Sequence, residues 1–180
     1  MVTQDVTFSG PSIRDEWTGS EHPVPVRTLA ELFADAVAGH ADRTAVWSDA
    51  GPLSFAELDA AANRLARLLI GRGAGPERVV ALVLPRSVQI VVAQLAVAKA
   101  GAAFLPVDPG YPAARIGFML SDARPVVVVT VAALVGTLPA GGTAPLVLDD
   151  PAVMSTLDGT ADGAVGDAER TSPLLVPSQR

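Results

Sequence analysis

Apolar residues recur with helical spacing behind the second of two helix-start signals. The signals are TLAE, with Thr28 and Glu31, and SFAE, with Ser54 and Glu57. In each, a hydroxyl and a glutamate can bond to backbone amides at the first turn of a helix. After Ser54, apolar residues at intervals of three and four form one stripe that glycines at 71 and 73 end. We expect this helix to leave its charged residues toward water, namely Asp59, Arg64, Arg67 and Arg72.

Short apolar runs predict the strands. TAVWS and GPLSF, around a turn at 49–52, indicate two short strands. RVVALVLP (78–85) is apolar on both faces, as a central parallel strand is. AAFLPV (102–107) and PVVVVT (125–130) supply two more strands.

Two helices are expected between the last three strands. The first is capped by Ser87 and closed by Gly101, and the second has Pro112 in its first turn and runs to about Asp122. Strand, helix, strand, helix, strand in this spacing is a βαβ succession. The expected fold class is therefore α/β, an open and mainly parallel sheet with helices on both faces.

The chain is expected to divide into four parts. These are a loose lead-in (1–27), a packed part (28–148), a flexible acidic loop rich in Gly, Ala and Asp (149–172), and the start of another strand where the chain ends (173–180). Residues 125–148 carry no charge, but two prolines and two glycines between 139 and 145 disfavour one continuous membrane helix. A buried strand that runs into a short helix fits this segment better.

Composition and charge exclude several classes of function. The chain is 49% hydrophobic and 18% charged, with a mean hydropathy of +0.38, so part of its surface is expected to lie against something else. A net charge of -6 without a Lys/Arg cluster disfavours nucleic acid as a partner. The absence of cysteine excludes disulfides, thiolate catalysis and cysteine-ligated zinc. The N-terminal residues do not form a secretory signal, so the cytoplasm is the expected location, with no membrane partner.

No pattern of residues forms a recognisable catalytic, cofactor or metal site. GRGAGP (71–76) has a proline where a dinucleotide-binding loop needs its third glycine, and it follows a helix. AGG (140–142) lacks the Gly-Lys-Ser/Thr of a phosphate loop, and the chain contains no Gly-x-Ser-x-Gly. His22 and His40 have no partner at ligand spacing, and Asp149 with its neighbour Asp150 fits a solvated turn.

Lys99 is the only lysine of the chain and is followed by Ala100 and Gly101. Because it lies in the last turn of an expected helix, its charge is expected to face unpaired carbonyls, which typically contributes ~0.3 to 1 kcal/mol. We therefore expect a structural role for Lys99. In a complete parent enzyme, Lys99→Met is expected to lower stability modestly and to leave activity measurable.

A series of short stretches resembles one family closely. LSFAEL, ANRLARLL, VVALVLPRS, LAVAKAGAAFLPVDPGYPAARIGFMLSDARP and VVVVT, in this order and spacing, resemble the opening of amino-acid adenylation domains from nonribosomal peptide synthetases. These domains belong to the adenylate-forming (AMP-dependent) synthetases and ligases. The resemblance extends over about residues 15–148, and retention of DPGYP favours amino-acid activation over acyl-CoA synthesis. The positions that carry it are Leu53, Ser54, Phe55, Glu57, Leu58, Arg86, Ser87, Lys99, Ala100, Gly101, Pro106, Asp108, Pro109, Tyr111, Pro112 and Arg115.

The resemblance implies a parent enzyme that joins ATP and an amino acid into an aminoacyl adenylate, with Mg²⁺, before transfer to a carrier thiol. The phosphate loop, the acidic motifs, the amino-acid pocket and the catalytic lysine of that family lie beyond PLLVP (173–177). The chain is therefore interpreted as an incomplete N-terminal subdomain that is inactive alone and binds no cofactor. The partners implied are the remainder of the adenylation domain or a downstream carrier-protein module, and some family members need a small MbtH-like accessory protein.

Three alternatives remain open at this stage. One is a non-catalytic α/β interaction module whose sheet or apolar face a partner chain completes. Another is the N-terminal part of an acyl-CoA synthetase-type ligase. The third, an unrelated nucleotide-binding α/β protein, has no phosphate loop to support it.

Overall fold

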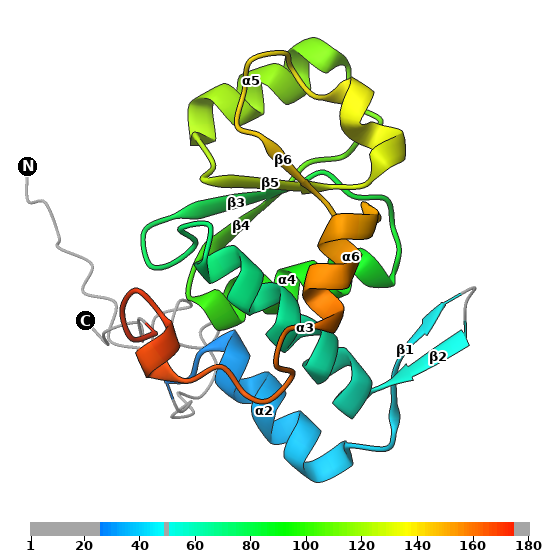
Figure 1. Ribbon diagram of the computed structural model, residues 1–180, viewed down its shortest axis with the longest axis vertical. Helices are drawn as coiled ribbons and strands as arrows, with labels where there is room; N and C mark the ends of the chain where they lie inside the picture. The colour runs from blue at the N-terminus through cyan, green and yellow to red at the C-terminus, as the bar shows by residue number, and fades with distance from the viewer. Residues whose placement is uncertain (1–25, 49–50, 175–180) are drawn as a thin grey trace, which may run out of the picture.

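Four parallel strands form the central sheet of the chain (Figure 1). The computed structural model describes residues 26–48 and 51–174. The strands are β3 (Val79–Leu82), β4 (Ala103–Pro106), β5 (Val127–Thr130) and β6 (Pro145–Val147), in the spatial order β4-β3-β5-β6. Every neighbouring pair in this sheet is parallel, which confirms the expected fold class.

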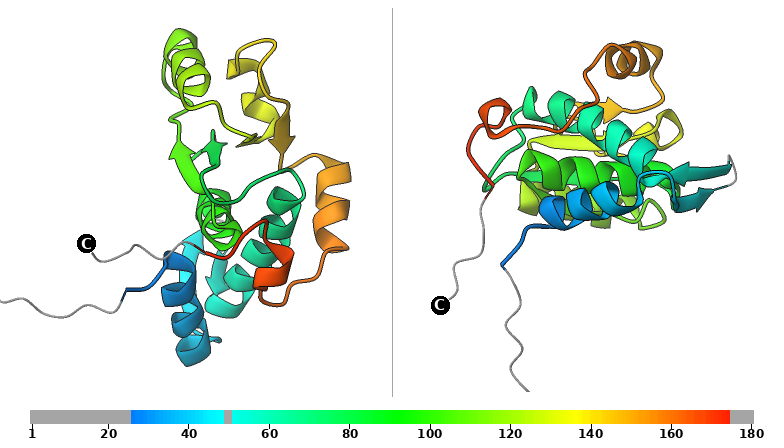
Figure 2. Two further views of the ribbon diagram at one scale, coloured as in Figure 1. Left: turned by 90° about the vertical axis from the view of Figure 1, so that its left-hand side faces the viewer. Right: turned by 90° about the horizontal axis from the view of Figure 1, so that it is seen from below.

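Helices cover both faces of this sheet (Figure 1 and Figure 2). On one face, Val80, Leu82 and Val129 pack with residues of α3 (Phe55–Ile70) and α4 (Val88–Ala100). On the other, Ala81, Val83 and Val128 pack with α5 (Ala113–Ala123). Neighbouring residues of one strand thus enter different clusters, which explains why the strands are apolar without interruption.

A helix and a hairpin precede the sheet. They are α2 (Leu29–His40), β1 (Thr44–Ser48) and β2 (Gly51–Ser54). The two strands pair antiparallel and project from the body beside α3 (Figure 1). The turn expected between them lies partly outside the described residues, and so does most of the lead-in. No helix in the described part of the chain is long and apolar enough to cross a membrane.

Two of the three predicted side-chain caps at helix starts are present in the structure. Both capping boxes are present, with the Thr28 and Ser54 hydroxyls accepting from the amides of Glu31 and Glu57. Ser87 stands at the start of α4, but its hydroxyl donates to the carbonyl oxygen of Pro85, 3.3 Å away, and caps no helix amide.

Pro112, expected in the first turn of α5, is instead the residue that precedes it. A short 3-10 helix, η1 (Ala132–Thr137), follows β5 as expected.

The expected flexible loop over 149–172 is wrong in its first part. Asp150 caps α6 (Pro151–Asp158), and its carboxylate accepts from the amides of Ala152 and Val153. Asp149 accepts from the amide of Ala132 at 2.7 Å. Both acids are exposed at a turn, as expected, and each also accepts hydrogen bonds from backbone amides. The helix forms because an Asp-Pro start is followed by apolar residues that pack against the α3 side of the sheet.

The capping box of α3 gives a pH-dependent prediction. Hydrogen bonds from the backbone amide and then the hydroxyl of Ser54 hold the pKa of Glu57 below its ordinary value. The stabilisation is therefore present above the ordinary pKa and is lost as the pH falls through the lowered one. We expect Ser54→Ala to cost about 1 kcal/mol at neutral pH. In urea denaturation, the free energy of unfolding of wild type should exceed that of Glu57→Gln by less at about pH 3 than at about pH 7. An equal difference in the free energy of unfolding at the two pH values would contradict this assignment.

Candidate functional site

A groove of about 350 Å³ opens at the carboxyl ends of β3 and β4. Ligands of open α/β sheets bind at this edge, outside the carboxyl ends of the strands. The groove is formed by the loop from β3 to α4 and the loop from β4 to α5, and its lining consists of Leu84, Pro85, Arg86, Ile90, Pro106, Val107, Asp108, Pro109 and Tyr111. Five of the sixteen motif positions therefore meet here, although Arg86 and Pro106 are twenty residues apart in the chain.

The loop after β4 is shaped by its own side chains. The Asp108 carboxylate accepts from the amide of Gly110 at 2.8 Å, which closes a tight turn. The Arg115 guanidinium lies over the Tyr111 ring, 4.5 Å from its centre, and fixes the ring against the start of α5. Asp108 and Arg86 are exposed, so the groove can contact a polar ligand. It brings together no paired acid and base of the kind that moves a proton.

Ser87 lies at the start of α4, and Pro112 and Arg115 lie at the start of α5. The other eight motif positions lie in two other places. Leu53, Ser54, Phe55, Glu57 and Leu58 form the start of α3, where Leu58 is buried and the others build the cap and the hairpin junction. Ala100 and Gly101 end α4, and Gly101 adopts the left-handed conformation (φ 80°) that closes the helix. These positions support the fold and do not reach the groove.

Lys99 forms a buried ion pair that the sequence did not reveal. Its Nζ lies 2.7 Å from Oδ1 of Asp59 on α3, with side chains 8% and 20% exposed. Oδ2 of Asp59 accepts from Nδ2 of Asn63 at 2.8 Å, and the ammonium lies 5.8 Å from the centre of the Phe33 ring. The expectation that Asp59 faces water and that Lys99 faces the carbonyls of its own helix is therefore wrong. Lys99 instead ties α4 to α3.

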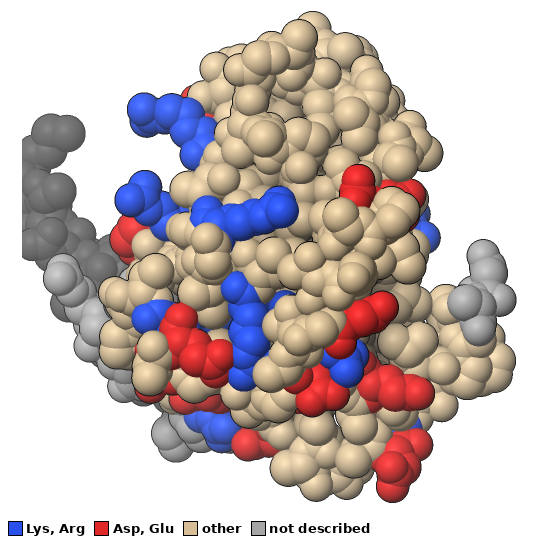
Figure 3. Space-filling model, in the orientation of Figure 1, with Lys and Arg blue, Asp and Glu red and all other residues tan. Residues whose placement is uncertain are grey.

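Charged residues do not gather into a single-sign patch on the face shown in Figure 3. Basic and acidic side chains are interspersed over the half that contains α2 and α3, whereas the half around α5 is mostly uncharged. Several of the charges are paired, such as Arg64 with Asp162 at 2.8 Å and Arg67 with Glu169 at 2.6 Å. Hydrogen bonds, first from the Arg67 side chain and then from the Gly166 amide, hold the pKa of Glu169 below its ordinary value.

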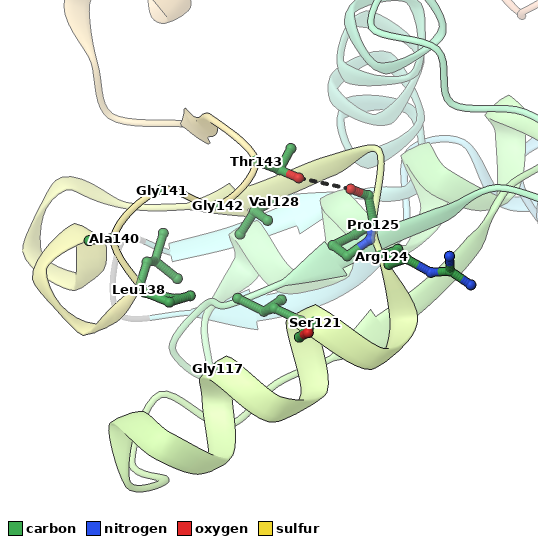
Figure 4. Close-up of a pocket in the computed structure, with 12 residues that line it drawn as sticks. Gly117, Ser121, Arg124, Pro125, Val128, Leu138, Ala140, Gly141, Gly142 and Thr143 are labelled. Carbon is green, nitrogen blue, oxygen red and sulfur yellow. Dashed lines mark hydrogen bonds between the residues drawn. The ribbon is translucent and has the colours of Figure 1, made fainter.

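Sequence reasoning did not identify a second cavity, of about 560 Å³, between α5 and residues 138–143 (Figure 4). Its wall is built from apolar side chains, from Ser121 and Thr143, and from the backbone of Gly141 and Gly142, whereas the Arg124 side chain extends away from it. The Thr143 hydroxyl donates a hydrogen bond to the carbonyl oxygen of Pro125 at 3.1 Å. The only sequence signal is AGG (140–142), which without a following lysine does not form a phosphate loop.

Comparison with known proteins identifies the family. Residues 33–175 match the family described as AMP-binding enzyme. The chain belongs to this family of AMP-binding enzymes. It is 46% identical over 153 residues to novobiocin biosynthesis protein H of Streptomyces niveus, covering 84% of this chain and 26% of that protein. It is 43% identical over 164 residues to a dimodular nonribosomal peptide synthase of Bacillus subtilis, covering 91% of this chain and 7% of that protein. The chain thus spans about a quarter or less of the length of these relatives.

Solved structures give the same family for this chain. The nonribosomal peptide synthetase FmoA3 superposes with a TM-score of 0.71 at 28% identity, over 81% of this chain and 15% of FmoA3. A benzoate CoA ligase from Burkholderia xenovorans superposes with a TM-score of 0.68 at 25% identity, over 77% of this chain and 29% of the ligase. The resemblance to adenylation domains of nonribosomal peptide synthetases is confirmed. The matched region also runs beyond residue 148 and includes α6 and the residues after it.

Proposed function

We propose that this chain forms the N-terminal part of an adenylation domain that activates an amino acid for nonribosomal peptide synthesis. The observation that carries the proposal is the DPGYP turn at the carboxyl ends of β3 and β4, in a chain 40–45% identical to synthetases of this class. In the proposed reaction, the carboxylate of an amino acid attacks the α-phosphorus of ATP and pyrophosphate leaves, so the enzyme must position two anions and offset their charge.

The described residues contain neither a cluster of metal-ligating side chains nor a phosphate loop. Within 26–48 and 51–174, no group of three or more His, Asp or Glu side chains could hold a metal ion. The whole sequence contains no Gly-Lys-Ser/Thr, and its one lysine is engaged by Asp59 inside the protein. We therefore propose that the catalytic groups come from residues outside this chain, and that the chain supplies the scaffold and the groove.

The benzoate CoA ligase neighbour keeps a second candidate, the N-terminal part of an acyl-CoA synthetase-type ligase. Both candidates transfer an activated acyl group to a thiol, either of CoA or of a carrier protein. A neighbour that is an adenylation–PCP di-domain shares the fold, with a TM-score of 0.71. The higher identities to nonribosomal peptide synthetases, 43% and 45%, favour the amino-acid reaction and a carrier-protein module as partner.

Pyrophosphate exchange tests the proposal. We expect purified residues 1–180 to show no exchange above background with any of the proteinogenic amino acids. A chimera in which residues 33–175 replace the matching segment of the dimodular nonribosomal peptide synthase of Bacillus subtilis should keep amino-acid-dependent exchange. That relative, unchanged, is the matched control for the assay. Exchange by the isolated chain would refute its inactivity. A folded chimera without exchange, or one active only with an aryl or fatty acid, would refute the assignment to amino-acid activation.

A further inference from the structure

The segment that follows α6, residues 159–174, forms a strap across α3 and the end of α4 (Figure 1). Arg67 of α3 is its main anchor. This one side chain donates five hydrogen bonds to the strap, three to the carbonyl oxygens of 161, 163 and 164 at 2.7–3.1 Å and two to the Glu169 carboxylate at 2.6 and 2.9 Å. All the donor nitrogens of the guanidinium are thereby directed at one segment.

A second anchor holds the far end of the strap. Nε of Arg170 donates to the carbonyl oxygen of Lys99 at 2.7 Å, and its Nη2 donates to that of Val165 at 2.9 Å. The Arg170 side chain is 8% exposed and also pairs with Asp167. Arg170 therefore satisfies a carbonyl at the end of α4, the role that the sequence suggested for Lys99.

The residues of the buried ion pair also contact the strap, at two places. Asn63, which bonds Asp59, also donates to the carbonyl oxygen of Asp162 at 2.7 Å. The Lys99 side chain thus supports the first part of the strap through Asp59 and Asn63, and its backbone carbonyl holds Arg170. The lysine, the two helices and the strap form one polar network.

Two glycines make room for the residues at which the strap leaves this network. A Cβ atom on Gly75 would lie 2.2 Å from the Thr171 hydroxyl oxygen, and one on Gly101 would lie 3.2 Å from a methyl carbon of Leu174. Gly101 thus closes α4 and also provides the seat for Leu174. Within the strap, Val165 alone belongs to the apolar core. The path of the strap therefore depends on the two arginines and on the contacts that Thr171 and Leu174 make at the two glycines.

We propose that Arg67 and Arg170 are positioning residues for adenylation. They hold the strap so that Leu174 sits on Gly101, and this fixes the exit, the place at which the strap leaves α3 and α4. The inference rests on the proposed function, because only a reaction that aligns two anions is sensitive to the placement of this exit. Neither arginine is proposed to contact a substrate.

Amide hydrogen exchange of residues 1–180 tests the anchors without relying on activity. In Arg67→Gln or Arg170→Gln, exchange over 161–174 is expected to accelerate about tenfold, because hydrogen bonds from a charged group are lost. Arg72→Gln, an exposed arginine just beyond α3, is the matched control and should leave this exchange unchanged. Unchanged exchange in both anchor variants would overturn the proposal.

Alanine substitutions at Gly101 and Gly73 test the contact between Leu174 and Gly101. Gly101 and Gly73 both have a positive φ, +80° and +89°, but only Gly101 has a strap atom near its Cβ position. Gly101→Ala should therefore accelerate exchange at 170–174 beyond any effect of Gly73→Ala, and adding Leu174→Ala to Gly101→Ala should reverse the excess. Equal effects of the two alanines would show that Leu174 is not seated on Gly101.

Kinetics of the chimera test the positioning role. We expect Arg67→Gln to lower kcat for pyrophosphate exchange at least about tenfold, with KM for the amino acid and the melting temperature little changed, because a displaced exit misaligns groups without unfolding the domain. Arg72→Gln should behave as wild type. A loosened strap with unchanged kcat would overturn the positioning role. If the parent chimera is folded but inactive, the proposed function and the positioning role that rests on it both fail, while amide exchange still decides whether the arginines hold the strap.

Discussion

Lys99→Met is expected to lower the free energy of unfolding of the chain by about 3 kcal/mol, the low end of the range for breaking a buried ion pair. The change leaves the Asp59 carboxylate largely buried, with the Asn63 amide as its remaining partner in the network. The low end applies because Asp59 is 20% exposed and keeps some contact with water. Methionine has nearly the length of lysine, so the loss of the charge and not a cavity accounts for the effect.

Urea denaturation of the single and double variants measures the interaction energy between Lys99 and Asp59. Asp59→Leu should cost at least as much as Lys99→Met, because it strands a buried ammonium group. The double variant should cost clearly less than the sum of the two, since an apolar pair replaces an ion pair at little net cost. Arg72→Met, at an exposed position, should change stability by less than about 0.5 kcal/mol. A loss below about 1 kcal/mol for Lys99→Met would mean that the charge acts only at the helix end.

Local sequence signals were sufficient for most of the sheet. The apolar runs that became β3 and β5 were predicted because strands buried on both faces are apolar without interruption. The run that became β4 was also predicted, although three of its four residues are exposed at the edge of the sheet. β6 was missed because three residues after a loop of glycine and proline carry almost no periodic signal. α6 was missed because the Gly- and Asp-rich composition after it outweighed the Asp150-Pro151 start signal.

The polar network could not be predicted, because its contacts join residues far apart in the chain. Arg67 and the strap residues that it binds are 94 to 102 positions apart, and Lys99 and Asp59 are 40 apart. A helical pattern assigns a charged residue to the solvent side when it lies off the apolar stripe, and it contains no information about a segment that later crosses that side. For the groove, the motif residues were identified from the sequence. Only their proximity depended on the pairing of β3 with β4.

Leu146→Ala tests the strand that the sequence did not reveal. Leu146 is fully buried in β6 and belongs to the cluster beneath α3 and α4, so its truncation should cost about 3 kcal/mol through lost burial and a residual cavity. Leu32→Ala makes the same chemical change at a leucine that is 54% exposed on α2, and it should cost less than about 1 kcal/mol. Denaturation midpoints of the two variants at equal slopes measure the difference. Equal costs would contradict the place of β6 in the sheet. A large cost at Leu146 alone would show that the core extends past residue 140, where the sequence pattern had weakened.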